Sequence, residues 1–194
     1  MAWNNTDIRD IVEHKLWELS DKSINVVNED SLEFHSDKES SSIFIQYNKT
    51  LLGDIRYKVS IEESFIKINV DFKDTIKANC VDKMIHLINT INSKKSSLSA
   101  FGYVDDYAQV KLEAEYHYSL WEIGESDFIS LLEARLESTH YTILVIEQAY
   151  EYIREGFDVP TAYLLALKDI NNKLESCTDV VVDYRNEGFS FDDE

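Results

Sequence analysis

The stretch DIRYKVSIEESFIKINVDFK, Asp54–Lys73, alternates apolar and polar residues in two successive runs. Apolar side chains occupy every second position, first at Ile55, Tyr57, Val59 and Ile61 and then at Ile66, Ile68, Val70 and Phe72. Neighbouring side chains of a β-strand point to opposite faces, so this alternation predicts two strands joined by a turn at Glu62-Glu63. One face of the resulting sheet is expected to be buried and the other to meet water.

Further strands are predicted on both sides of this pair. Upstream, IFIQY, residues 43–47, predicts one strand, and residues 23–36 predict a short hairpin that turns at Asn28-Glu29-Asp30. Downstream, SAFGYVDDYAQVKLEAEYHYS, residues 99–119, predicts a second hairpin that turns at Asp105-Asp106. On its return strand the apolar face is expected to hold Val110, Leu112, Ala114, Tyr116 and Tyr118, and the polar face Gln109, Lys111, Glu113, Glu115 and His117.

Four segments have the apolar spacing of helices: residues 6–19, 75–92, 126–155 and 159–177. The second has its stripe at Val81, Met84, Ile85, Ile88 and Ile91. Gly156 is a typical helix stop, and Asp158 and Pro160 are typical of a helix start. The last helix has its apolar seam at Tyr163, Leu167, Ile170, Leu174 and Cys177. Such a seam requires a helical neighbour, either the preceding helix or another subunit.

These elements predict an α+β fold, in which a mainly antiparallel sheet is flanked by helices. The expected order is one helix, a hairpin of two strands, three strands, a helix, two strands and two helices. We expect residues 1–177 to form a single domain and residues 178–194 to form an acidic tail, since 194 residues are enough for one well-buried core.

The chain is strongly acidic, with 37 Asp and Glu against 19 Lys and Arg and a formal net charge of -18. This charge repels phosphate backbones and anionic membranes, and it favours a partner with a basic segment. Cys80 and Cys177 lie far apart on the apolar sides of predicted helices, which is typical of free thiols in a reducing compartment. The segment MAWNNTDIRD lacks a signal-peptide pattern and no apolar run could span a membrane, so we expect a cytoplasmic protein.

No catalytic or cofactor-binding motif is present: the chain has no HExxH, P-loop, GxGxxG or GxSxG pattern. We therefore expect a protein that is not an enzyme and needs no cofactor. Glu113, Glu115 and His117 share one face of a predicted strand and form a weak candidate for a cation site or an acid-base group. The alternative is an ordinary solvated face of the sheet.

Aromatic residues supply the candidates for partner binding. Tyr116, Tyr118 and Trp121 lie where the second hairpin meets the long helix, and they either pack in the core or line a peptide groove. Phe189 and Phe191 precede Asp192-Asp193-Glu194 and are candidates for a docking segment in the tail. The predicted strands also provide a sheet edge to which an extended partner segment can add.

The element order and the segment FGYVDDYAQVKLEA, residues 101–114, resemble the type III secretion chaperone-like fold, including the YbjN family. The resemblance spans residues 7–156, and the early hairpin, the last helix and the tail depart from the family pattern. It implies a dimer-forming, non-enzymatic binding module that takes extended segments of another protein on its sheet or helix face.

The expected function is therefore protein binding of a chaperone-like or regulatory kind. The alternative is an acidic inhibitor, either an immunity protein that blocks a toxin or a mimic of nucleic acid in the basic cleft of a nuclease. Mimicry requires carboxylates that crowd one face, whereas the predicted sheet intersperses them with Arg56, Lys58, Lys67, Lys73 and Lys111. A homodimer through Leu167 and the rest of the last helix's seam is a further expectation.

Overall fold

The computed structural model describes residues 10, 14–15, 32–36, 42–61, 65–94, 100–117 and 125–177. Within these ranges the strands are β1 (Leu32–Ser36), β2 (Ser42–Thr50), β3 (Gly53–Ile61), β4 (Phe65–Phe72), β5 (Phe101–Val104) and β6 (Val110–His117). The helices are the short 3-10 turn η2 (Ala78–Cys80), α2 (Val81–Lys94), α3 (Glu125–Glu155) and α4 (Val159–Cys177). The fold is α+β, as the sequence predicts.

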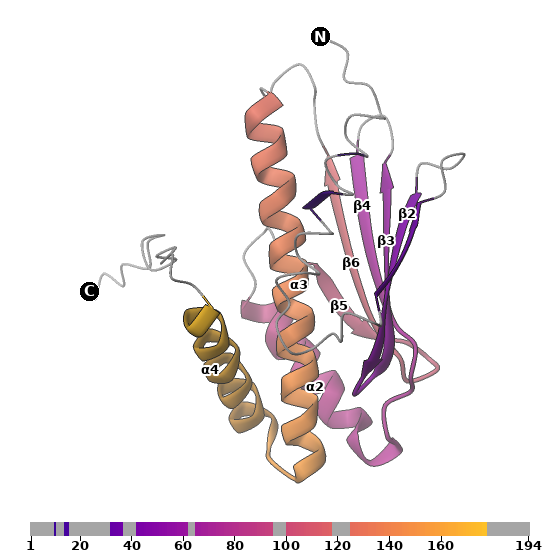
Figure 1. The fold of residues 1–194 in the computed structure, drawn as a ribbon. Coiled ribbons are helices and arrows are strands. Elements are labelled where there is room, and N and C mark those ends of the chain that lie inside the picture. Colours follow the sequence, from indigo (N-terminus) through magenta and orange to yellow (C-terminus); the bar gives the residue numbers. More distant parts are fainter. Residues whose placement is uncertain are drawn as a thin grey trace, which may run out of the picture.

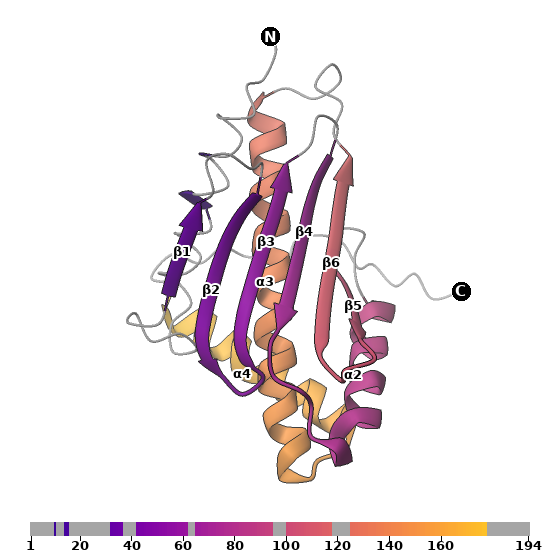
Figure 2. The same ribbon diagram turned by 90° about the vertical axis from the view of Figure 1, so that its right-hand side faces the viewer.

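The strands described form one antiparallel sheet in the order β1-β2-β3-β4-β6-β5. The helices lie on one side of it: α3 runs along the sheet, and α4 lies beyond α3 (Figure 1). Turned by 90°, the molecule presents the other face of the sheet, and no helix of the described residues lies in front of it (Figure 2). The predicted asymmetry, one covered face and one open face, is therefore present.

The register between β3 and β4 confirms the alternating pattern from which the sheet was predicted. Tyr57 pairs with Val70 and Val59 with Ile68, and all four side chains are buried in the core. The intervening pair, Lys58 with Asn69, lies on the open face, where both side chains are partly exposed. The helices therefore pack against the apolar residues of each strand.

The helix α2 begins later than residue 75, where the sequence predicts its start, because the backbone before it is extended, with Lys77 at φ -56° and ψ 135°. Two backbone amides of this segment donate hydrogen bonds to other elements. Ile76 N donates to Ala108 O at 2.8 Å, and Lys77 N donates to Tyr150 Oη at 3.2 Å. The predicted stripe is also wrong at one position, since Ile85 is 41% exposed. The buried residues of α2 are Met84, Leu87, Ile88 and Ile91.

The seam of α4 is centred on different residues from those predicted. The side chains buried on this helix are Val159, Ala162, Ala166 and Ile170. Tyr163 and Leu167 are only partly buried at the border of the core, and the side chains of Leu174 and Cys177 lie outside the description. Two alanines allow the backbones of α3 and α4 to approach closely, whereas the sequence pattern gave weight to the larger residues.

The helical neighbour of α4 is α3 of the same chain. The turn between them follows the prediction, with Gly156 at φ +106° and Asp158 Oδ1 accepting from Thr161 N at 2.8 Å. Polar contacts add to the packing: Tyr141 Oη donates to Asn171 Oδ1 at 3.1 Å, and Tyr152 Oη donates to Asp169. The bond to Asp169 raises the pKa of Tyr152 to about 12.

Several predicted elements lie partly or wholly outside the described residues. Of the predicted helix 6–19, Asp10, His14 and Lys15 are helical, and Lys15 Nζ pairs with Glu137 Oε1 of α3 at 2.7 Å. Of the predicted hairpin 23–36, only β1 is described, and it pairs with β2. Residues 178–194 are not described. No helix in the described ranges is long and apolar enough to cross a membrane.

Candidate functional site

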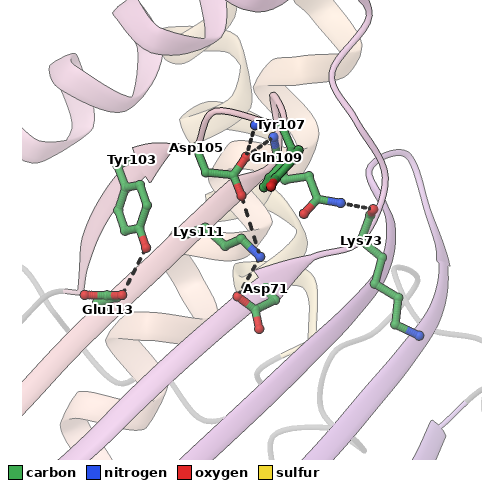
Figure 3. A network of polar contacts seen from close by, with 8 residues as sticks. All are labelled: Asp71, Lys73, Tyr103, Asp105, Tyr107, Gln109, Lys111 and Glu113. Carbon is green, nitrogen blue, oxygen red and sulfur yellow. Dashed lines mark hydrogen bonds and ion pairs between the residues drawn. The ribbon is translucent and has the colours of Figure 1, made fainter.

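The turn of the β5–β6 hairpin is fixed by hydrogen bonds to a single carboxylate. Asp105 Oδ1 accepts from Tyr107 N and from Gln109 N, both at 2.9 Å (Figure 3). Backbone bonds from Asp105 N to Gln109 O and from Ala108 N to Asp105 O close the same turn. Ala108 adopts a positive φ of 57°, which the tight reversal requires. The sequence predicted this turn correctly at Asp105-Asp106.

The turn is also tied to the end of β4. Gln109 Nε2 donates to Lys73 O at 2.6 Å (Figure 3). Ala108 O accepts from Ile76 N at 2.8 Å. Both bonds link the hairpin to the segment that leaves the sheet after β4. The tip of the hairpin is therefore held at two points outside its own strands.

This hairpin carries two of the most exposed large apolar side chains among the described residues: Phe101 is 60% exposed and Tyr107 is 78% exposed. Phe101 pairs with Glu113 and Tyr103 with Lys111, so both β5 rings belong to the open face. Gly102, between them, is buried; a Cβ there would lie 3.0 Å from side-chain atoms of Ile88 and Leu112. At position 102 the inner side of β5 therefore leaves little room for a side chain, whereas the rings of Phe101 and Tyr103 lie on the outer side.

Charged side chains are ordered around these rings. Lys111 Nζ lies 3.0 Å from Asp71 Oδ1 and 4.0 Å from Asp105 Oδ2 (Figure 3). Tyr103 Oη donates to Glu113 Oε1 at 3.0 Å. Partial burial of its ring, followed by the bond to Glu113, raises the pKa of Tyr103. The hairpin thus combines exposed aromatic rings, at Phe101 and in the turn at Tyr107, with oriented carboxylates.

The three residues proposed as a weak cation site share the open face but have separate partners. His117 Nε2 lies 3.1 Å from Glu115 Oε1, whereas Glu113 accepts from Tyr103. No group of three His, Cys, Asp or Glu residues placed to hold a metal ion occurs in the described part of the chain. In this arrangement Glu113, Glu115 and His117 form part of a solvated sheet face.

Of the other predicted binding residues, the structure describes only Tyr116 and Leu167. Tyr116 is buried, and the guanidinium carbon of Arg135 lies 3.9 Å from the centre of its ring, which agrees with the core-packing alternative. Burial raises the pKa of Tyr116. Leu167 lies on α4, on the far side of α3. Tyr118, Trp121, Phe189 and Phe191 lie outside the described residues.

The sheet edge at β5 is covered by α2 (Figure 2). Asn92 Nδ2 donates to Gly102 O at 2.7 Å, and Gly102 N donates to Asn92 Oδ1 at 3.0 Å. The carboxamide of Asn92 therefore occupies both backbone groups of Gly102 that a further strand would pair with. Strand addition, which the sequence suggested for the sheet edges, is obstructed at this edge.

Sequence reasoning missed Phe101, Tyr107 and Asn92 as surface determinants. The signal for Phe101 was present, since pairing β5 with β6 around a turn at residues 105–109 places Phe101 opposite Glu113 on the polar face. No local pattern indicates the role of Asn92, because its partner lies on the next element.

No protein-family model matches the chain, and a search of curated proteins gives no match.

Proposed function

We propose that this protein is a non-enzymatic protein-binding module that contacts its partner through the β5–β6 hairpin, at Phe101 on β5 and Tyr107 in the turn. The observation that carries the proposal is the exposure of Phe101 and Tyr107, at 60% and 78%, on a hairpin whose turn is fixed by hydrogen bonds. Aromatic rings are enriched in protein interfaces because they bury a large area and lose little conformational freedom.

The arrangement of layers supports this choice of surface. The described helices pack against one face of the sheet, and no described helix lies in front of the other face (Figure 2). Because Asn92 occupies the edge of β5, we expect the partner to be held at this end by side-chain contacts rather than by strand addition. A chaperone-like or regulatory role, as the family resemblance implies, is part of this proposal.

The acidic-inhibitor alternative receives less support from the open face. Arg56, Lys58, Lys67 and Lys111 all belong to this face, between carboxylates such as Asp71. A surface that imitates nucleic acid needs a continuous array of negative charge, and these cations interrupt it. Cytoplasmic location is also proposed, and the buried free thiol of Cys80 is consistent with it.

The proposal is tested by capturing stoichiometric partners from the native host with matched surface variants. Phe101→Ser and Tyr107→Ser each remove one exposed ring of the hairpin. Leu164→Ser is the control, since Leu164 is 62% exposed on α4, away from the hairpin. We expect both hairpin variants to lose the partner and the control to retain it. Equal capture by all three folded variants would refute the proposed surface.

A further inference from the structure

The side chain of Glu113 is held by a hydrogen bond from Tyr103 rather than by an ion pair with a basic residue of the described ranges. Its Oε1 accepts from Tyr103 Oη at 3.0 Å, which limits the orientation of the side chain. Within the described ranges Glu113 has no ion-pair partner, whereas Lys111 on the same face is bound to Asp71 at 3.0 Å and Glu115 lies beside His117. Its neighbour across the sheet on β4 is the uncharged Asn69.

Aromatic rings stand on the β5 side of this carboxylate. Phe101 is directly opposite Glu113 in the β5–β6 register, and side chains opposite one another in an antiparallel pair are about 5 Å apart at Cβ. Tyr103 is the next residue of β5 on the same face. An exposed phenyl ring, a tyrosine ring and an uncompensated carboxylate therefore surround one position on the open face.

We propose that Phe101, Tyr103 and Glu113 bind an arginine side chain from an extended segment of the partner. The guanidinium is planar, so it can pair with the carboxylate of Glu113 and lie against the ring of Phe101. Arginine fits better than a metal ion, because only one carboxylate converges on the position. The inference rests on the proposed function and adds the chemistry of the partner, in agreement with the net charge of -18.

The test uses an acetylated, amidated peptide that alternates arginine and threonine, which places the arginines on one face when extended. Binding is followed by amide NMR shifts and by titration at low and high salt. We expect shifts at Phe101, Tyr103 and Glu113, weaker binding at high salt, and no binding of the peptide with glutamine in place of arginine. Glu113→Gln keeps an acceptor for Tyr103 but removes the charge, and should weaken binding about threefold to fivefold.

The control for general attraction to an acidic protein is Glu155→Gln. Glu155 is exposed at the end of α3, on the covered side of the sheet. Its replacement by glutamine removes the same charge as Glu113→Gln. Phe101→Leu, which removes the aromatic ring, should weaken binding about twofold to fivefold. The inference is overturned if Glu113→Gln binds the arginine peptide as tightly as the wild type, or if Glu155→Gln weakens it as much.

The outcomes separate this inference from the proposed function. Absence of arginine-peptide binding, together with a captured partner that still depends on Phe101 and Tyr107, overturns the arginine site and leaves the hairpin as a binding surface. If Phe101→Ser and Tyr107→Ser both capture the partner as well as the wild type, the proposed function itself is refuted. Peptide shifts confined to the helices would also refute the site.

Discussion

His140 shows how a polar residue of α3 is accommodated beneath the sheet. It is only 8% exposed, and its Nδ1 lies 3.2 Å from Tyr57 Oη of β3. Burial lowers the pKa of His140 to about 4, because the charged imidazolium loses its hydration. A similar accommodation occurs at Glu147, which is 5% exposed and accepts from Leu51 N at 3.0 Å. Polar contacts thus align α3 with strand β3 and with the turn that precedes it.

The first prediction follows from the lowered pKa of His140. The unfolded chain binds a proton near pH 6.5, whereas the folded chain resists protonation until about pH 4. Neutral His140 therefore contributes fully to stability above pH 6.5. As the pH falls from 6.5 to about 4, this contribution is lost, and the free energy of unfolding decreases by about 3 kcal/mol at most. Urea unfolding at pH 7 and pH 5 should show a larger loss for the wild type than for His140→Gln. His86→Gln, at an exposed position, should behave as the wild type; equal losses in all three would contradict the assignment.

At the scale of elements, α2 and β5 are joined by the pair of bonds between Asn92 and Gly102. The two elements follow one another in the chain, and the carboxamide gives the edge strand the two hydrogen bonds that a neighbouring strand would supply. Because Gly102 is buried, its N–H and C=O groups cannot readily form hydrogen bonds with water in place of those with Asn92.

The second prediction is that Asn92→Ala destabilises the fold. Loss of both bonds leaves a buried donor and a buried acceptor without partners, which costs about 1–3 kcal/mol. The free energy of unfolding should fall by that amount, and the Gly102 amide should exchange its hydrogen faster. Asn89→Ala, an exposed change three residues earlier on α2, should have an effect within about 0.5 kcal/mol. Unchanged exchange at Gly102 in Asn92→Ala would contradict this account.

The strands were predicted from the sequence more accurately than the packing of the helices. Strict alternation identified β3, β4 and β6 with their faces, because one side of the sheet is covered by helices and the other is in water. The seam of α4 was misplaced because Ala162 and Ala166 carry little hydrophobic signal and become interfacial only through close helix packing. The hydrogen bonds of Asn92 to Gly102 depend on tertiary contacts, so residue spacing alone does not reveal them.

At the scale of the whole molecule, α4 covers α3 of its own chain, which supplies the helical neighbour that its apolar side requires. The third prediction is that Leu167→Asp lowers the free energy of unfolding by about 1–3 kcal/mol and leaves the molar mass unchanged. Leu164→Asp, at a 62% exposed position of the same helix, should alter neither quantity. Light scattering and urea unfolding check both variants. A folded Leu167→Asp protein with half the wild-type mass would instead make this seam a dimer interface.

The central claim is that the β5–β6 hairpin, with Phe101 on β5 and Tyr107 in the turn, is the surface that binds a partner. Its most direct test is hydrogen exchange of the chain, alone and in complex with its captured partner. We predict slower exchange on binding across β5, the turn at residues 105–109 and β6, with α4 unchanged. Protection confined to α3 and α4, with the hairpin exchanging as in the free chain, would contradict the claim.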